Sequence, residues 1–280
     1  MPWSHAIRSF RRFPPMAALV MASLLTNPLA THAKDPELWP ALQRDVFGER
    51  EVVEGTGAVT LYAPANAQDA ALLPISIRIP ANTVAHARTL TLIVDSNPAP
   101  VVATFTFGDG FRDSDNVGER MLETRIRLDS RSHVRAVLET ADGKLHMSAK
   151  YVIGAGGCSA SPTKDPEAAL ADLGRMNIRT TAADVRGPTW RETRVMIKHP
   201  NFTGLQMDPV SRGYVPARFV NDLEVTTGGR LLFRMEGGIS ISENPNLRFS
   251  YGAGEDDTVQ VKATDTTGAA WTQTSQTKGS

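Results

Sequence analysis

The chain contains one cysteine in 280 residues, Cys158, so it cannot form an internal disulfide and its fold must be held by its core alone. Long apolar runs are also missing. The run from Met16 to Leu25 is ten residues long, which is too short to span a bilayer, and no later stretch approaches the needed length. We therefore expect no membrane span.

An excess of basic charge is absent as well. Three of the 30 Lys and Arg residues lie in the first 33 positions, which leaves 27 basic against 30 acidic residues and no basic run. This balance lacks the electrostatic pattern of a nucleic-acid binder, so we expect no nucleic-acid partner. The length allows one large domain or two of ordinary size.

The first 33 residues predict a cleavable export signal. Arg8, Arg11 and Arg12 precede the apolar run, and small residues at 31–33 follow it. The mature protein is therefore expected in the periplasm. The Arg11-Arg12 pair leaves both the Sec and the twin-arginine route open.

The remaining chain alternates apolar and polar residues with a period of two, which is typical of half-buried strands. Seven such segments lie between Val59 and Ile153, and five lie between Thr193 and Ala263. Residues with turn chemistry separate them. The pattern predicts an all-β fold of two immunoglobulin-like β-sandwich domains joined by a flexible Gly/Ser loop and a short helix.

Helical signals are few. A helix-capping residue followed by proline predicts a short helix at residues 35–48 and another at residues 168–176. The second lies within the linker between the two series of strands. The polar tail at 272–280 has no periodicity and is expected to fray.

Cys158 lies in a loop of glycines and small residues directly after the last strand of the first series. Gly154, Gly156 and Gly157 precede it and Ser159 follows, so the loop has little side-chain bulk to pack. This favours a mobile loop with an exposed thiol of ordinary pKa, near ~8.5. The alternative is a small buried cysteine chosen for packing. A mobile exposed thiol suits a carrier on which other enzymes act.

Other chemistries fit the sequence less well. The run from Gly154 to Ser159 imitates a dinucleotide-binding fingerprint, but the preceding strand alternates and Pro162 stops any helix. A cysteine hydrolase needs a histidine base, and no sequence feature joins the mature chain's histidines to Cys158. These are His86, His133, His146 and His199. Their spacing and the single cysteine do not suit a metal site, so we expect no catalytic residue, no metal and no cofactor.

Two groups of motifs resemble the SoxY and SoxZ sulfur carrier families. Gly156-Gly157-Cys158 after a terminal strand resembles the swinging arm of SoxY. Four later stretches are similar, in order and spacing, to SoxZ: residues 198–204, 215–219, 238–245 and 247–249. The chain as a whole resembles a fused SoxYZ-like carrier of the kind named for its association with quinoprotein dehydrogenases.

The resemblance implies domain limits and residue roles. Residues 1–33 are the signal peptide, 34–155 a SoxY-like sandwich, 156–189 the cysteine-bearing loop and helical linker, and 190–275 a SoxZ-like sandwich. Cys158 is the site of covalent sulfur attachment, and Gly154, Gly156, Gly157 and Ser159 form the flexible arm. His199 and Pro200 shape a strand end or the contact between the sandwiches.

The resemblance also implies partners. A c-type cytochrome loads the cysteine oxidatively and sulfur-processing enzymes, among them a hydrolase, act on the adduct. The arm here differs from the two-subunit carriers, because Ser159 and Pro162 follow the cysteine and the chain continues. An arm tied at both ends cannot enter a deep active site as a free tail does, which favours another sulfur pathway or a quinoprotein dehydrogenase system.

Three hypotheses follow from the sequence. The first is a periplasmic carrier that is not an enzyme and bears a sulfur-containing adduct on Cys158. The second is a non-covalent adaptor or binding module of a periplasmic quinoprotein (alcohol) dehydrogenase system, in which the cysteine is incidental. The third is an enzyme with Cys158 as nucleophile, which requires an imidazole beside the sulfur. The cargo, a homodimer, and packing of the two sandwiches within one chain stay open.

Overall fold

The computed structural model describes residues 38–112, 118–160, 170–182, 190–208, 211–254, 256 and 258–275. The predicted signal peptide therefore lies outside the described residues. The described elements are three helices and fifteen strands: α1 Trp39–Phe47, β1 Val52–Glu54, β2 Thr60–Tyr62, β3 Leu73–Ile79, α2 Ala81–Val84, β4 Ala87–Val94, β5 Val101–Phe107, α3 Asp109–Arg112, β6 Arg120–Ile126, β7 Ser132–Thr140, β8 Leu145–Val152, β9 Met176–Ala182, β10 Trp190–Ile197, β11 Val220–Thr227, β12 Arg230–Gly237, β13 Asn246–Gly252, β14 Val259–Asp265 and β15 Ala270–Ser275. The predicted all-β class is confirmed.

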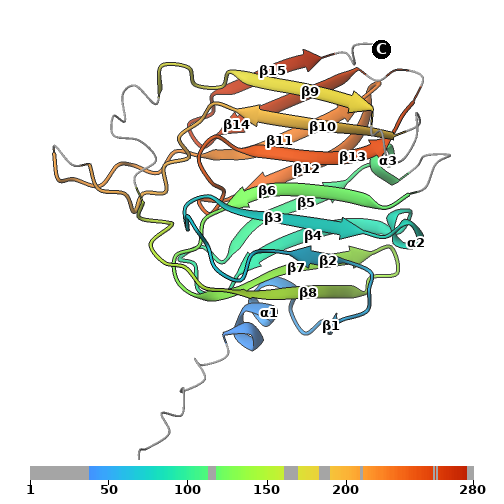
Figure 1. The fold of residues 1–280 in the computed structure, drawn as a ribbon, viewed down its shortest axis with the longest axis horizontal. Helices are drawn as coiled ribbons and strands as arrows, with labels where there is room; N and C mark the ends of the chain where they lie inside the picture. Colours follow the sequence, from blue (N-terminus) through green and yellow to red (C-terminus); the bar gives the residue numbers. More distant parts are fainter. Residues whose placement is uncertain are drawn as a thin grey trace, which may run out of the picture. The chain divides into compact units, whose positions relative to one another are not determined.

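The strands form two packed sheets (Figure 1). The nine-stranded sheet has the order β1-β8-β7-β4-β5-β12-β11-β14-β15, and the six-stranded sheet has the order β2-β3-β6-β13-β10-β9. Neighbouring strands are antiparallel, except that β1 runs parallel to β8. Each sheet thus contains strands from the N-terminal half (β1–β8) and from the C-terminal half (β9–β15).

The two halves join edge to edge in both layers. In the nine-stranded sheet β5 pairs with β12, and Phe105 lies opposite Met235. In the six-stranded sheet β6 pairs with β13, and Leu122 lies opposite Phe249. Pairing satisfies the backbone groups that an open sheet edge would expose. The sequence left open whether the sandwiches pack on each other within one chain, and in this structure they do.

Period-two alternation explains the core between the sheets. In β3, for example, Leu73, Ile75, Ile77 and Ile79 are all buried and alternate with polar or partly exposed residues. One hydrophobic cluster runs through both halves. At the joint, the ring centroid of Phe233 lies 5.8 Å from that of Phe105 and 5.0 Å from that of Phe249. The first of these edge-to-face contacts joins the two halves, and the second joins the two sheets within the C-terminal half.

Helix α1 covers the outer face of the nine-stranded sheet. Its Trp39 packs with Ile93, Val137 and Met147 in a second buried cluster. The predicted N-terminal helix is thus confirmed from Trp39 onward, and residues 35–37 lie outside the described part. None of the helices in the described residues is long and apolar enough to cross a membrane.

Several sequence-based boundaries were wrong. Residues 171–174 form turns and Met176 begins β9, so the predicted helix does not extend to 176, and 161–169 are outside the described residues. The tail predicted to fray forms β15 up to Ser275, because it pairs with β14. Strands β1 and β9 were also missed, since three-residue and polar strands carry little hydrophobic signal.

Candidate functional site

The cysteine loop, residues 153–160, follows β8 at one end of the sandwich. Its backbone is hydrogen-bonded to neighbouring segments of the N-terminal half. The Ile153 amide donates to the Ala65 carbonyl at 2.9 Å. Further along, the Gly156 and Gly157 amides donate to the carbonyls of Asp129 and Leu128 at 2.7 and 2.9 Å. The loop therefore lies against the chain that leaves β6.

Two of the predicted arm glycines are required by this geometry. Gly156 has a φ of 77°, a left-handed conformation that side chains other than glycine rarely adopt. At Gly157, a Cβ would stand 2.1 Å from the Ala70 carbonyl oxygen, so no larger residue fits. Gly154 is packed too, since its Cβ would lie 2.9 Å from the Leu128 side chain. These glycines permit close packing here, and the flexibility of the arm stays a prediction.

The Cys158 side chain is 0% exposed, so the expectation of an exposed thiol was wrong. The sequence alternative, a buried cysteine, describes this conformation. Ser159, in contrast, is exposed and its hydroxyl donates to the Gly156 carbonyl. The error arose because the residues that cover the thiol are distant in sequence and cannot be inferred from the loop's own composition.

Burial also changes the chemistry of the thiol. Desolvation, and then the negative charge of Asp129, raise the pKa of Cys158 to about 11. The Arg127 charge and a hydrogen bond with the Ser240 hydroxyl lower it only in part. The expectation of an ordinary pKa was therefore wrong. Because the thiolate is the nucleophile, Cys158 is unreactive while the loop is packed in this way.

The C-terminal half holds the loop from its other side. The Thr203 hydroxyl donates to the Cys158 carbonyl at 2.7 Å, and the Gln206 side-chain amide donates to the Ala160 carbonyl at 2.9 Å. The Gln206 side-chain oxygen in turn accepts from the Thr203 amide at 3.1 Å. The cysteine loop thus lies at the junction of the two halves.

Arg127 is the buried cation at this junction. Its side chain is 0% exposed and donates to the carbonyls of Gly157 at 2.9 Å and Asn201 at 3.4 Å. Burial lowers the pKa of Arg127, while Cys158 and Glu243 raise it. An arginine keeps its charge under such conditions, so a positive charge stands beside the thiol and bonds both halves of the chain.

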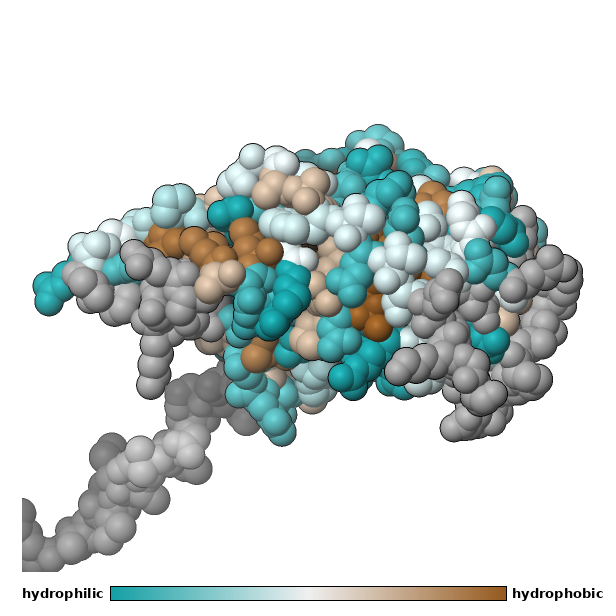
Figure 2. All heavy atoms as spheres, turned by 90° about the horizontal axis from the view of Figure 1, so that it is seen from above, coloured by the Kyte–Doolittle hydropathy of each residue, from teal (hydrophilic) through white to brown (hydrophobic). Residues whose placement is uncertain are grey.

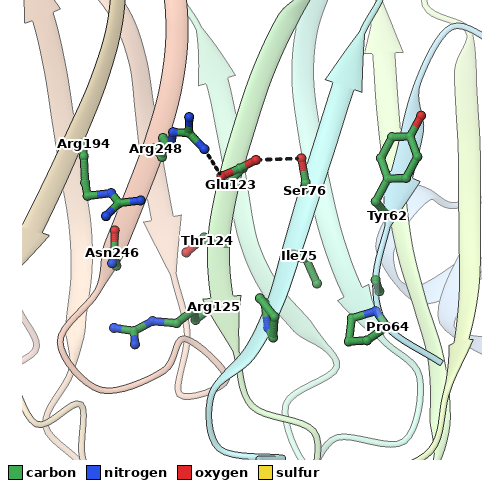
Figure 3. A pocket seen from close by; sticks show the side chains of 12 residues that line it. Tyr62, Pro64, Ile75, Ser76, Glu123, Thr124, Arg125, Arg194, Asn246 and Arg248 are labelled. Atoms are coloured by element: carbon green, nitrogen blue, oxygen red, sulfur yellow. Dashed lines mark hydrogen bonds and ion pairs between the residues drawn. The ribbon is translucent and has the colours of Figure 1, made fainter. Parts of the chain in front are cut away.

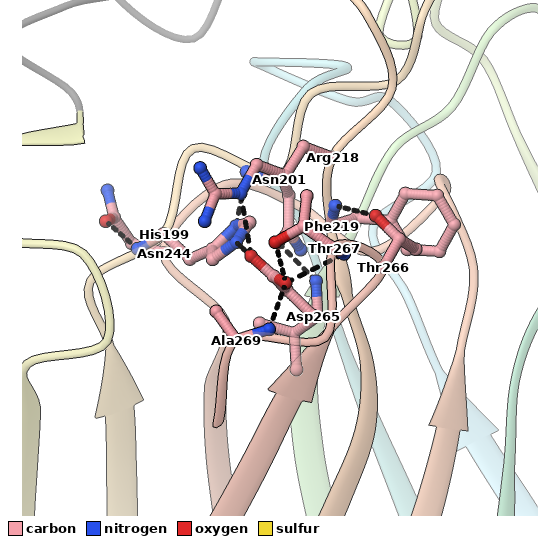
Figure 4. A network of polar contacts seen from close by, with 10 residues as sticks. His199, Asn201, Arg218, Phe219, Asn244, Asp265, Thr266, Thr267 and Ala269 are labelled. Atoms are coloured by element: carbon pink, nitrogen blue, oxygen red, sulfur yellow. Dashed lines mark hydrogen bonds and ion pairs between the residues drawn. The ribbon is translucent and has the colours of Figure 1, made fainter. Parts of the chain in front are cut away.

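A polar network supports the junction from the C-terminal half (Figure 4). The His199 ring accepts the Asn201 amide at Nδ1 (3.0 Å), so its Nε2 carries the proton and faces Asp265 at 3.4 Å. Arg218 donates to the same Asp265 oxygen at 2.7 Å. The Asn201 side chain donates to the Ser242 carbonyl at 3.0 Å and accepts from the Val220 amide. Figure 4 shows His199, Arg218, Thr267 and Ala269 grouped around Asp265.

The charges in this network are fixed by their surroundings. Burial lowers the pKa of His199, and Asp265 only partly offsets this, so the imidazole is neutral. Burial opposes ionisation of Asp265, but hydrogen bonds from Thr267 and Arg218 lower its pKa to about 2. His199 is fully buried and shapes the loop after β10, which supports the structural role inferred for it.

The other histidines lie elsewhere. His133 packs edge-on against Tyr151, with ring centroids 5.1 Å apart, and His146 contacts the hydroxyls of Thr56 and Thr140. His86 is exposed next to β4. The described groups that shift the pKa of the Cys158 thiol are Asp129, Arg127 and Ser240, and no imidazole is among them. The arrangement therefore does not favour the Cys158 nucleophile hypothesis.

Sequence reasoning missed the residues that hold the loop. Arg127 and Gln206 stand in stretches with no motif, and only the tertiary contacts reveal them. Thr203 and Ser240 had a signal, because they belong to the stretches 198–204 and 238–245 that carry the SoxZ resemblance. Both stretches contact the cysteine loop in the structure.

Exposed apolar residues lie on the same loop system. Met207, which directly follows Gln206, is 53% exposed, and Tyr214, which pairs with Met207 in a β-bridge, is 68% exposed. Figure 2 shows apolar residues gathered at the end of the molecule from which this segment projects in Figure 1. The cysteine loop is thus bordered by a surface suited to contact with another protein.

Comparisons with known proteins assign the two halves of the chain to two families of sulfur oxidation proteins. Residues 43–158 match the family of the sulfur oxidation protein SoxY, and residues 178–276 match that of the sulphur oxidation protein SoxZ. A solved structure of the sulfur carrier protein SoxY from Chlorobium limicola f thiosulfatophilum is 21% identical and covers 41% of this chain and 89% of that chain, with a TM-score of 0.31. None of the curated proteins matches. The chain therefore joins a SoxY domain and a SoxZ domain in one polypeptide and belongs to the fused SoxYZ-like carriers.

Proposed function

We propose that this protein is a periplasmic carrier that holds a sulfur-containing intermediate covalently on Cys158, while partner redox and hydrolytic enzymes process it. The observation that carries the proposal is the position of Cys158. It is the chain's single cysteine and the last residue of the SoxY match, and side chains of the SoxZ half hold its backbone. Two domains of sulfur oxidation families thus meet at the one residue able to bind sulfur covalently.

The proposed cycle requires the loop to leave its packed position. Forming a sulfur–sulfur bond between the Cys158 thiol and a sulfur-containing anion releases the thiol proton and two electrons, which a c-type cytochrome accepts. A hydrolase then uses water to release the oxidised terminal sulfur as sulfate, and the inner sulfur stays on Cys158. Since the packed thiol is covered and has a raised pKa, the packed state protects the carrier between partners.

The hydrogen bonds that hold the loop allow such a motion. Those from Arg127, Thr203 and Gln206 all end on backbone carbonyls of residues 157–160. Water can replace each of these hydrogen bonds when the loop moves out. Opening therefore exchanges hydrogen bonds to the protein for hydrogen bonds to water. Neither Gly156 nor Gly157 has a side chain to remove from the core.

Intact-mass spectrometry of protein purified from its own periplasm tests the proposal. We expect an added mass on the wild-type chain that a reductant removes and that Cys158→Ala lacks. Protein of unmodified mass in both cases, under conditions in which the partner enzymes are active, would contradict the carrier function.

A second candidate function has one observation in its favour. Burial of the thiol suits a non-covalent adaptor of a quinoprotein dehydrogenase system, in which Cys158 serves packing alone. The two functions differ in a measurable way. An adaptor keeps its activity in Cys158→Ala, whereas a carrier loses it completely.

A further inference from the structure

A basic groove crosses the outer face of the six-stranded sheet, and neither the fold nor the carrier chemistry accounts for it. It encloses about 430 Å³ and spans strands β2, β3, β6, β13 and β10, so both halves of the chain build it. The side chains that matter are Tyr62, Pro74, Ser76, Arg125, Arg194 and Arg248 (Figure 3). We call this site the arginine groove.

Strand register places three arginines side by side. Arg194 on β10 lies directly opposite Arg248 on β13 and directly opposite Arg179 on β9. Like charges opposite each other on paired strands destabilise a sheet. Arg248 is balanced by Glu123, at 3.1 Å, and by Glu192. Among the residues that the structure describes, Arg194 and Arg179 have no acidic partner.

Arg125 adds a further unsatisfied donor. Its Nη2 donates to the Asn244 carbonyl at 3.2 Å, but its Nε is buried without a hydrogen-bond partner. Figure 3 shows the Arg125 and Arg194 side chains both extending toward the strand that carries Asn246. Two guanidinium groups that keep N–H donors available thus face one groove. This local positive charge contrasts with the slightly acidic overall charge of the mature chain.

We propose that the arginine groove binds an acidic segment of a partner protein. Charge complementarity requires an anionic occupant. The groove's length favours an extended segment over a small ion, because five strands at a spacing of roughly 4.8 Å span about 19 Å. That is the length of about six extended residues. Tyr62, which is 55% exposed, and Pro74 provide an apolar wall at the other end.

The groove's position relates it to the cysteine loop. Arg125 lines the groove, and Arg127, two residues later, donates to the Gly157 carbonyl. Similarly, β3 begins just after Ala70, whose carbonyl contacts Gly157. A protein held by an acidic segment in the groove would therefore stand next to Cys158. This last step rests on the proposed carrier function, but binding of the acidic segment does not.

Fluorescence anisotropy with a labelled hexaglutamate peptide tests the proposal on the mature protein. Binding is expected at about 50 mM salt, and weakening at about 200 mM, because the attraction is between exposed charges. The charge reversal Arg194→Glu should weaken binding about tenfold or more, the loss expected for a charge-assisted hydrogen bond turned into a repulsion. The same reversal at Arg88, which is exposed on β4 of the other sheet, should leave the affinity unchanged.

Three results would overturn the proposal: no peptide binding, equal losses in Arg194→Glu and Arg88→Glu, or displacement of the peptide by submillimolar sulfate. The last result would show a site for a small oxyanion. Arg179→Glu, outside the groove but in the same arginine row, provides a second variant should Arg194→Glu fail to fold, and it should weaken binding several-fold. Because adduct mass on Cys158 is measured separately, failure of the groove and failure of the carrier function are distinguishable.

Discussion

The Thr203 hydroxyl donates a 2.7 Å hydrogen bond to the backbone carbonyl of Cys158, although the two residues belong to different family domains. The contact joins the proposed sulfur attachment residue to the half of the chain that has no cysteine. The second domain thus helps to hold the loop that carries the cysteine of the first domain. Because the bond ends on the backbone carbonyl, it can hold the loop whether or not the Cys158 sulfur carries an adduct.

Removing this bond should make the thiol more accessible. Thr203→Val keeps the side-chain shape and removes the donor, so the open state should gain about 1 kcal/mol, or about fivefold in population. The rate of Cys158 modification by iodoacetamide at constant pH should rise by the same factor. Thr272→Val, at an exposed position of β15, is the matched control and should leave the rate unchanged. An unaltered rate in Thr203→Val would show that the bond does not restrain the loop.

The pKa of Cys158 should make stability depend on pH. The folded thiol has a pKa of about 11, above that of an unfolded cysteine, so the folded state holds its proton more tightly. The resulting stabilisation is fully present below about pH 8.5, the pKa of an unfolded cysteine, and is lost as pH rises toward 11.

Urea unfolding between pH 8 and 11 measures this effect. The free energy of unfolding of the wild type should fall by about 3 kcal/mol more than that of Cys158→Ser, which has no thiol to ionise. Comparison with the variant removes the contribution of the lysines and tyrosines that titrate in the same range. Parallel pH profiles for the two proteins would mean that the thiol is not buried in solution.

Close packing at Gly157 predicts a severe effect of a single methyl group. In Gly157→Ala the new Cβ would stand 2.1 Å from the Ala70 carbonyl oxygen, so the loop has to move away. We expect the thiol of this variant to react at the rate of an exposed cysteine, while the core strands stay folded. Reaction with a chromogenic disulfide, followed beside the circular dichroism of the sheets, checks both points.

Gly213→Ala is the control for that experiment. Gly213 does not have a positive φ, and an added Cβ there would have only the Ser211 hydroxyl nearby, at 3.6 Å, so neither thiol reactivity nor stability should change. A protected thiol in Gly157→Ala would show that the loop adapts to the methyl group without leaving its site.

Much of the fold could be predicted because strand formation is a local property. Alternation in segments such as Leu73–Ile79 places every second side chain in the core, and the structure has a strand there. Strands with a weak pattern, such as Met176–Ala182, were missed because pairing with β10, and not hydrophobicity, specifies them. The family motifs around Cys158 and His199 could likewise be recognised in the sequence, because each is a run of consecutive residues.

The sequence by itself determined that there is one thiol, that it lies in a glycine-rich loop after a strand, and that SoxY-like and SoxZ-like motifs stand on either side of it. Only the tertiary structure decided that this thiol is covered. Its surroundings come from Ala70, Arg127, Thr203 and Ser240, which are brought together by the pairing of β5 with β12 and β6 with β13. Burial and pKa depend on which distant residues meet in space, and the composition of one loop does not contain that information.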